Sequence, residues 1–299
     1  MKIEGIAAFV AVAEAGSISE AARRLNLSKS VVSERLAELE RSLESPLLHR
    51  TTRKLSLTED GAAFLERASA ILRDIDAAVA DLAERRGTLS GPLRLSAPVT
   101  FGRMHLGPAL YPFLRDNPRI ELTLDLNDRR VDAAADGFDA VIRHGPIFDS
   151  RLMAWRLAPS RRVLVAAPSY LAEHGAPRSL DDLTAHRALT YTNRGVTDWQ
   201  FAGPNGAITI KAPVGLRVNN GDMLRDATLA GLGIAFLPTF IIGDAVKAGT
   251  LKVIDIGSPA LADFVYMAHP EGRQPSAKLR ALAGSLRTAF GQPPYWEWT

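Results

Sequence analysis

Apolar residues recur at steps of three and four through the first part of the chain, which is the spacing of one buried helix face. Ser17 and Ser28 stand where a helix N-terminus needs a side-chain oxygen to accept hydrogen bonds from free N–H groups. Asn26 tolerates the left-handed backbone that often ends a helix. The pattern therefore predicts three helices, which cover residues 3–15, 17–26 and 28–43.

The third predicted helix has one apolar face, which carries Val32, Leu36 and Leu39. Its opposite face is polar and rich in short or charged side chains near the N-terminal end. Two helices joined by a turn of three or four residues are typical of a helix-turn-helix, whose second helix enters the major groove of DNA. A plain helical bundle would give residues 17–43 the same pattern, so both interpretations stay open on these residues alone.

Two short apolar runs, 47–50 and 55–57, flank a polar basic tip and predict a β-hairpin of the kind called a wing. Arg50, Arg53 and Lys54 lie at or beside that tip. Next to a groove-entering helix, such side chains would contact DNA phosphates or the narrow minor groove. A solvated loop without a partner is the alternative.

A long run without proline follows Thr58 and predicts one linker helix over residues 59–86. At 1.5 Å per residue such a helix is about 40 Å long. Its apolar positions form a narrow seam like that of a coiled coil, which a single helix cannot bury. We therefore expect pairing with a second copy of the chain, although packing on the C-terminal part is an alternative. The seam comprises Phe64, Ala68, Ile71, Ile75, Val79 and Leu82.

Beyond a hinge at residues 87–92, short β-branched runs alternate with helical patterns, which is typical of an α/β domain. The helices that the pattern predicts cover residues 106–117, 222–230 and 240–248. The predicted strands cover residues 93–97, 120–126, 140–143, 162–166, 233–237 and 264–268.

Segments 137–143 and 231–238 share one plan of glycine, apolar strand and turn, and we expect them to be matching edges of two subdomains. A ligand of an open α/β fold binds beyond the carboxyl ends of its strands. The candidates there follow two of the predicted strands or precede a helix. They are Ser96, Thr100, Phe101, Arg143, His144, Asn219, Asn220 and Gly221.

Each of these candidates also has a purely structural explanation. Ser96, Thr100 and Asn220 could simply cap the helices that follow them. Arg143 ends an apolar strand, where its charge needs a partner. An anionic ligand or a nearby carboxylate would both serve.

The composition of the 299-residue chain narrows the function further. Hydrophobic residues make up 46% and charged residues 23%, as in an ordinary globular protein, and the net charge is only +3. The absence of cysteine excludes disulfides, thiolate nucleophiles and zinc fingers. No stretch reaches the roughly 20 apolar residues of a membrane span. The first fifteen residues imitate a signal peptide, but their helical spacing favours an amphipathic helix, and we expect a cytoplasmic protein.

Catalytic signatures are lacking in the sequence. The six histidines never fall three or four residues apart, so no helical metal pair is evident. No nucleophile elbow, phosphate loop or complete dinucleotide fingerprint occurs. We expect no enzyme activity, no metal and no cofactor other than a small-molecule effector.

These motifs together resemble the winged helix-turn-helix of LysR-type transcriptional regulators over residues 3–65, and the likeness extends to nearly the whole chain. The segments that carry it are FVAVAEAGS at 9–17, AARRL at 21–25, SKSVVS at 28–33, LAELE at 36–40, HRTTR at 49–53 and LTEDG at 57–61.

The resemblance implies a homo-oligomer, commonly a tetramer built from dimers through the linker helix. It implies a C-terminal domain of the periplasmic-binding-protein type, with two lobes that hold a small-molecule effector between them. The expected partners are an operator in double-stranded DNA, further copies of the chain, the effector and RNA polymerase. The expected domains are the DNA-binding domain 1–58, the linker helix 59–86, and an effector domain 93–299 with lobe one at 93–161 and 264–299 and lobe two at 162–263.

By match to the family motif, the candidate DNA contacts on the third helix are Lys29, Ser30, Ser33, Glu34 and Arg35. Glu34 departs from the pattern, because many relatives carry arginine or another hydrogen-bond donor there. It could accept from cytosine N4, or pair with Arg23 or Arg24 instead of touching DNA. A solute-binding protein or enzyme that uses the first ninety residues as a scaffold is the competing class.

Overall fold

The computed structural model describes residues 2–50, 55–84, 88–129, 131–133, 136–145, 152–194, 199–203, 206–258, 260–270 and 275–298. The chain forms two compact units, Met1–Thr88 and Leu89–Thr299, which are described separately.

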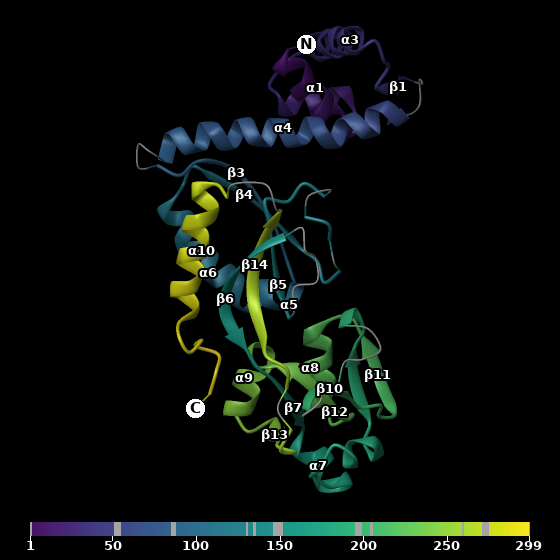
Figure 1. The fold of residues 1–299 in the computed structure, drawn as a ribbon, viewed down its shortest axis with the longest axis vertical. Helices are drawn as coiled ribbons and strands as arrows, with labels where there is room; N and C mark the ends of the chain where they lie inside the picture. Colours follow the sequence, from purple (N-terminus) through teal and green to yellow (C-terminus); the bar gives the residue numbers. More distant parts are fainter. Residues whose placement is uncertain are drawn as a thin grey trace. The chain divides into compact units, whose positions relative to one another are not determined.

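The N-terminal unit combines helices with one two-stranded hairpin, and its last helix is long and continuous (Figure 1). Its elements are α1 (Ile3–Ala15), α2 (Ile18–Arg24), α3 (Lys29–Leu43), β1 (Leu48–Arg50), β2 (Leu55–Leu57) and α4 (Glu59–Glu84).

The helix boundaries of this unit follow the capping residues that the sequence predicts. Ser17 Oγ accepts from the N–H of Glu20 at 3.5 Å, and Ser28 Oγ accepts from the N–H of Val31 at 3.3 Å. Asn26 is left-handed, with a φ of 53°. The three predicted helices and the hairpin are therefore confirmed.

The seam expected along α4 is divided between two environments. Ala68 is buried in the core of the N-terminal unit, and the Phe64 ring lies 5.6 Å from the Phe9 ring of α1. Farther along the same helix Ile71 and Val79 are exposed, by 46% and 62%. The first turns of α4 thus complete the fold of its own unit, and only the later positions are available to a second chain.

The C-terminal unit contains two five-stranded sheets, which define its two lobes. Sheet one has the order β4-β3-β5-β14-β6, and α10 packs on α6 and β6 of this lobe (Figure 1). The elements of lobe one are β3 (Gly91–Ala97), α5 (Val99–Phe101), the π-helix η1 (Gly102–Leu106), α6 (Gly107–Asp116), β4 (Ile120–Leu126), β5 (Ala140–His144), β6 (Leu152–Ser160), β14 (Asp263–Pro270) and α10 (Ala277–Phe290).

Sheet two has the order β11-β8-β12-β7-β13, with a separate β9-β10 hairpin in the same lobe. The elements of lobe two are β7 (Arg162–Ala166), α7 (Pro168–His174), η2 (Asp182–Ala185), β8 (Ala188–Tyr191), η3 (Thr192–Arg194), β9 (Gln200–Gly203), β10 (Gly206–Thr209), β11 (Val214–Val218), α8 (Gly221–Leu229), β12 (Ile234–Pro238), α9 (Thr239–Lys247) and β13 (Lys252–Ile254).

The chain passes between the two lobes twice. It leaves sheet one at Ser160, enters sheet two at Arg162, and returns to sheet one at Asp263. Lobe one is therefore built from two parts of the chain that lie far apart in sequence, whereas the strands of lobe two all come from one continuous stretch between the two crossings.

All six predicted strands are present, although β12 begins at Ile234 rather than one residue earlier. Strands β6, β8, β11 and β13 and helix α10 were not among the predicted elements. The sheet-edge strands β6 and β13 mix buried and exposed positions and the edge strand β11 has no buried position, so all three lack a continuous buried apolar run.

The expectation that segments 137–143 and 231–238 form sheet edges is wrong. Strand β5 is the central strand of sheet one, and β12 is the central strand of sheet two. Every residue of β12 is buried, as are the first three of β5. A central strand has a neighbouring strand on each side and is covered on both faces of the sheet, so its sequence is a continuous apolar run. This is why the two segments have similar sequences.

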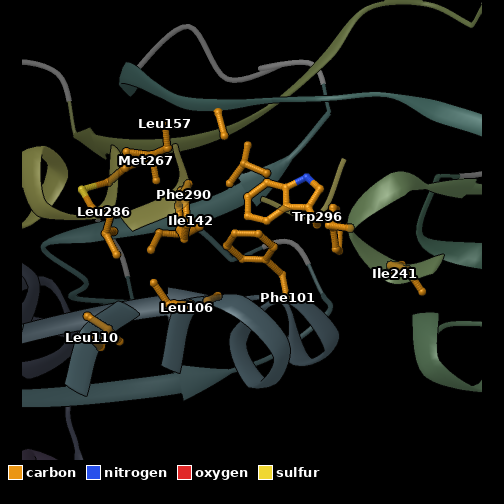
Figure 2. Close-up of a cluster of buried hydrophobic side chains, with 14 of the residues drawn as sticks. Phe101, Leu106, Leu110, Ile142, Leu157, Ile241, Met267, Leu286, Phe290 and Trp296 are labelled. Carbon is orange, nitrogen blue, oxygen red and sulfur yellow. The ribbon is translucent and has the colours of Figure 1, made fainter. Parts of the chain in front are cut away.

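A large hydrophobic core runs from lobe one into lobe two. Phe101, Phe290 and Trp296 lie together in it, and Figure 2 shows the Phe101 ring beside the Trp296 indole. The Phe101 ring meets those of Phe290 and Trp296 edge-on, with centroids 5.6 Å and 6.1 Å apart. Ile241 of α9 belongs to the same core, so both lobes contribute to it.

Candidate DNA-binding face and interlobe effector site

The exposed side of α3 carries the residues expected to contact DNA. Lys29, Ser30 and Glu34 are exposed, whereas Ser33 and Arg35 are half-buried. The buried side of the same helix holds it in the core through Val32, Leu36 and Leu39. The N-terminal part of α3 therefore presents short polar and basic groups to solvent.

The Ser30 hydroxyl is already engaged within the helix, because its Oγ lies 2.8 Å from the Oγ of the capping Ser28. A hydroxyl can both donate and accept, so this bond leaves Ser30 able to contact DNA as well.

Of the two alternatives for Glu34, pairing with Arg23 or Arg24 is not what the structure shows. Both arginines pair with Glu20 on their own helix, at 2.6 Å and 3.6 Å. Glu20 lies three and four residues before them, which is the spacing at which helix side chains meet. Glu34 stays exposed beside the end of α3 that carries Lys29.

The hairpin expected to act as a wing is present, with Arg50 opposite Leu55 in its ladder. Arg53 and Lys54, the other basic residues proposed for its tip, lie outside the described residues.

In lobe one, three adjacent parallel strands bring functional side chains to one end of the sheet. Strand β3 pairs in parallel with both β4 and β5, so the carboxyl ends of all three meet. The chain then places Thr100 just after β3, Asp128 just after β4 and Arg143 near the end of β5. This is the position at which ligands bind in open α/β sheets.

Arg143 is a half-buried cation held by neutral oxygens. Its guanidinium donates to Ser96 Oγ at 2.9 Å and to the carbonyl of Ile142 at 2.8 Å, with a longer contact of 3.4 Å to the carbonyl of Arg129. Burial lowers the pKa of the Arg143 guanidinium, and the nearby Tyr266 and Asp128 oppose that shift. Arg143 forms no ion pair with a carboxylate within the described parts of the chain.

Asp128 accepts hydrogen bonds from both lobes. Its Oδ1 accepts from the N–H of Val99 at 2.9 Å, and Asn220 of lobe two donates to the same carboxylate. The Asp128 carbonyl accepts from Asn193 Nδ2, also of lobe two, at 2.8 Å. Burial raises the pKa of the Asp128 carboxyl, while the Val99 N–H and Asn220 act in the opposite direction.

The N-terminus of α8 supplies the lobe-two side of the site. Asp222 crosses to lobe one, where Thr100 Oγ1 donates to its Oδ2 at 3.2 Å and Arg103 donates to its Oδ1 at 2.7 Å. Arg225 of α8 also lies 3.1 Å from Asp222 Oδ1. The carboxylate of Asp222 is therefore neutralised by two arginines, one from each lobe.

We refer to these residues as the interlobe cluster. It comprises Ser96, Thr100, Asp128 and Arg143 of lobe one with Asn193, Asn220 and Asp222 of lobe two.

Several residues proposed from the sequence therefore come together. Ser96 and Thr100 do not cap a helix, since their hydroxyls bond to Arg143 and Asp222. Asn220 does cap α8, where its Oδ1 accepts from the N–H of Met223 at 3.0 Å, and it also bonds to Asp128.

Other proposed effector residues take different positions. The Phe101 side chain is in the hydrophobic core rather than in the interlobe cluster, because its ring is only 1% exposed. His144 packs edge-on against Phe240 and lies 3.8 Å from Asp263. Asn219 is exposed, and Gly221 is buried against Ile241 and Thr100.

Four residues of this region were missed by the sequence interpretation, namely Arg103, Asp128, Asn193 and Asp222. Asp128 could have been found, since it follows the predicted strand 120–126 and so lies at the same sheet end as the other candidates. Asn193 follows β8, a strand that was not predicted.

No group of three or more metal-ligating side chains in the described residues is arranged to hold a metal ion. Within the same residues, no helix is both long enough and apolar enough to cross a membrane.

Comparison with known proteins identifies both units. Residues 3–62 match the model of the bacterial regulatory helix-turn-helix proteins of the lysR family, and residues 86–291 match the LysR substrate binding domain. The chain is 34% identical over 290 residues to the HTH-type transcriptional regulator DmlR of Escherichia coli, across 95% of this chain and 93% of that protein.

Solved structures agree in fold over the full length. CrgA, a LysR-type transcriptional regulator from Neisseria meningitidis, is 30% identical with a TM-score of 0.57, covering 97% of each chain. A full-length OxyR variant from Pseudomonas aeruginosa superposes with a TM-score of 0.72 over 100% of this chain and 99% of its own, at 19% identity, a likeness of fold alone.

The protein belongs to the LysR family of transcriptional regulators. It is a DNA-binding regulator with a winged helix-turn-helix and an effector-binding domain, and it is not an enzyme. The competing interpretation, a solute-binding protein or enzyme with a helical scaffold, is therefore wrong.

Proposed function

We propose that the regulator is controlled by a small molecule that binds at the interlobe cluster and places an anionic group on Arg143. The observation that carries this proposal is the state of Arg143, a half-buried guanidinium whose hydrogen bonds within the described residues go to neutral oxygens. A charge removed from water is costly unless an opposite charge compensates it, and a ligand carboxylate would do so through charge-assisted hydrogen bonds.

An effector bound at the interlobe cluster would change the hydrogen bonds that link the two lobes. Asp222 to Thr100, Asp222 to Arg103, and Asn193 to Asp128 each join one lobe to the other around Arg143. An effector that makes different contacts in two lobe arrangements shifts the balance between them. The effector thereby changes how the DNA-binding units are spaced or how the bound DNA is bent.

For DNA binding, two chains would dimerise through the exposed half of α4. Two such dimers would then form a tetramer. Each dimer would place two α3 helices in successive major grooves of a double-stranded operator, about one helical turn apart. In this proposal the regulator acts in the cytoplasm, and the DNA-bound regulator contacts RNA polymerase.

The test is a footprint of the purified full-length protein on the DNA upstream of its own gene, across a series of salt concentrations. We expect a long protected region with a dyad, and binding that weakens steeply as salt displaces phosphate contacts. Arg53→Ala should weaken binding to all sequences and flatten the salt dependence, whereas Ser33→Ala should alter sequence preference.

Arg143→Gln is the matched variant for the effector half of the proposal, because it removes the charge and keeps some hydrogen-bonding capacity. It should leave the footprint without effector intact and abolish the response to small carboxylates. An unchanged response would exclude Arg143 as the anion site. Lack of protection at low salt, on that DNA and in a random-sequence selection, would exclude the proposed DNA interface.

A further inference from the structure

The arginines around the interlobe cluster differ in how their charge is balanced. Arg103 and Arg225 share the carboxylate of Asp222, at 2.7 Å and 3.1 Å. Arg225 has a second anion in Asp226 at 2.9 Å. Arg143 forms no such ion pair with any described residue, and its hydrogen bonds in the same residues go to neutral oxygens.

Asp128 is a negatively charged residue of the interlobe cluster that, like Arg143, is held by neutral groups. The groups that donate to its carboxylate are the neutral Val99 N–H and the neutral Asn220 amide. No lysine or arginine among the described residues forms an ion pair with it. The Arg143 charge acts to lower the pKa of Asp128 and the Asp128 charge acts to raise the pKa of Arg143, although the two side chains form no ion pair.

Asp222 cannot take the place of Asp128 in binding a further cation. Its Oδ1 already accepts from Arg103 and contacts Arg225, and its Oδ2 accepts from Thr100. Two arginines therefore screen its charge. Of the two acidic side chains in the interlobe cluster, Asp128 is the one that forms no ion pair with a lysine or arginine of the described residues.

We propose that the effector is a small zwitterion, which places a carboxylate on Arg143 and a protonated amine on Asp128. This inference rests on the proposed function of the same site. A ligand with acidic groups alone would bring a further negative charge towards Asp128, and a simple amine would meet the positive charge of Arg143. A zwitterion compensates both half-buried charges at once and adds no net charge to the site.

Neutral groups of the interlobe cluster are suited to hold the same ligand in place. Ser96 lies against the Arg143 guanidinium, and Asn220 lies against the Asp128 carboxylate. A hydroxyl and an amide can each donate and accept, so each can bond to a charged ligand group beside the residue it already contacts. The amino acid class, with one carboxylate and one amine on a short carbon skeleton, fits this arrangement.

The experiment measures binding of matched probes to the full-length protein by calorimetry and by thermal stabilisation. The zwitterions are norvaline, 4-aminobutyrate and 5-aminovalerate. Each is compared with the acid that lacks the amine, pentanoate or butyrate, and with the amine that lacks the acid, pentylamine or butylamine. We expect at least one zwitterion to bind about tenfold or more tightly than its matched acid, the factor that one charge-assisted hydrogen bond supplies.

Variants locate the two charges. Asp128→Asn should remove the advantage of the zwitterion over its acid, and Arg143→Gln should abolish binding of both. Asp226→Asn is the control, because Asp226 is exposed and, among the described residues, its carboxylate pairs with Arg225 of its own helix alone. It should leave every affinity unchanged. The comparison of probes on the unmodified protein stands even if an Asp128 variant fails to fold.

The outcomes separate this inference from the proposed function. Equal affinity for zwitterion and acid, lost in Arg143→Gln, would overturn the zwitterion and leave the anionic effector site standing. Binding that Arg143→Gln does not change would overturn both. No response to any zwitterion at about 10 mM, a concentration that detects even weak millimolar binding, would also overturn the zwitterion.

Discussion

Gly61 occupies a position in α4 where no side chain fits. A Cβ atom built there would lie 2.0 Å from the carbonyl oxygen of Leu47 and 2.9 Å from its carbonyl carbon. Both are backbone atoms of the segment that leads into the wing, so neither can turn aside as a flexible side chain could. The Gly61 N–H donates to Thr58 Oγ1 at 2.9 Å, which caps the helix.

We predict that Gly61→Ala destabilises the N-terminal unit by about 1–3 kcal/mol, the usual cost of overpacking a close contact. Hydrogen exchange of amides in α1 to α3 measures the change within the full chain. Gly284→Ala is the matched control, since a Cβ at this α10 position meets nothing within 4 Å. The control should gain about 0.5–1 kcal/mol, because alanine favours a helix over glycine. Equal effects of the two substitutions would contradict the prediction.

His105 links the π-helix of lobe one to lobe two and to the C-terminal segment. Its Nε2 lies 2.9 Å from the carbonyl of Phe240, and its Nδ1 lies 2.7 Å from the Tyr295 hydroxyl. Burial lowers the pKa of His105, and the hydrogen bond to Phe240 only partly opposes that shift. The folded state therefore favours the neutral ring.

A histidine with a lowered pKa binds its proton less readily in the folded chain than in the unfolded chain. The stability it contributes is full above about pH 6.5 and is lost as pH falls from there towards the folded-state pKa. We predict that His105→Asn makes the stability of the C-terminal unit less dependent on pH between about 7 and 5. Urea midpoints at each pH measure this slope. His49→Asn, on the exposed strand β1, is the control, and an identical slope in both variants would refute the role of His105.

At the scale of elements, the C-terminal segment after α10 fastens the two lobes together. Glu297 accepts from Arg161, which lies between β6 and β7, at 2.6 Å, and also from Thr239 of α9. Trp296 fills the core beside Phe101, only 3% exposed. The segment thus bridges the point where the chain crosses from one lobe to the other.

We predict that Trp296→Ala costs about 3–5 kcal/mol of stability, as large-to-small changes of buried aromatic residues do. Trp296→Phe should cost clearly less, about 1–2 kcal/mol. The reason is that the buried indole N–H has no hydrogen-bond acceptor among the described residues, so the replacement breaks no hydrogen bond. Denaturation of the full chain, followed at the C-terminal unit, measures both. A phenylalanine variant as unstable as the alanine variant would show that the N–H has a partner.

For the whole molecule, the exposed apolar positions of α4 predict self-association with a second chain. Ile71 is 46% exposed and Val79 is 62% exposed, on a helix whose first turns are packed within its own unit. We predict that Ile71→Glu weakens self-association by about tenfold or more, because a charge would be buried in the apolar seam. Ala63→Glu, on an exposed position of the same helix, is the control.

Light scattering during gel filtration over a range of protein concentrations measures this dissociation. The affinity for DNA should fall in parallel, since a single helix-turn-helix contacts only one half-site. If Ile71→Glu and Ala63→Glu dissociate at the same concentration, the exposed part of α4 is not the interface.

Structural features that depend on residues close together in the chain could be predicted from the sequence. The capping serines and Asn26 set the helix boundaries of the N-terminal unit, and the run of β12 gave a buried strand. Each follows from short-range geometry, in which a side chain caps its own helix or a continuous apolar run marks a strand covered on both faces. The edge strands β6, β11 and β13 were missed because their patterns resemble those of loops, whereas the edge strand β4 was predicted.

The class of the protein could be inferred before the fold was known, because the motifs in residues 3–65 that resemble LysR-type regulators and the α/β alternation beyond them are local properties. Ser96, Thr100, Arg143 and Asn220 could be proposed because each lies near a strand or helix end. The pairing of the charges follows from the tertiary structure: Asp222 lies against two arginines, whereas Arg143 and Asp128 form no ion pair with any described residue. These side chains come from segments that meet only when the two lobes form. The balance of charge at a site depends on distances between segments remote in sequence, and the pattern of residues along the chain does not record them.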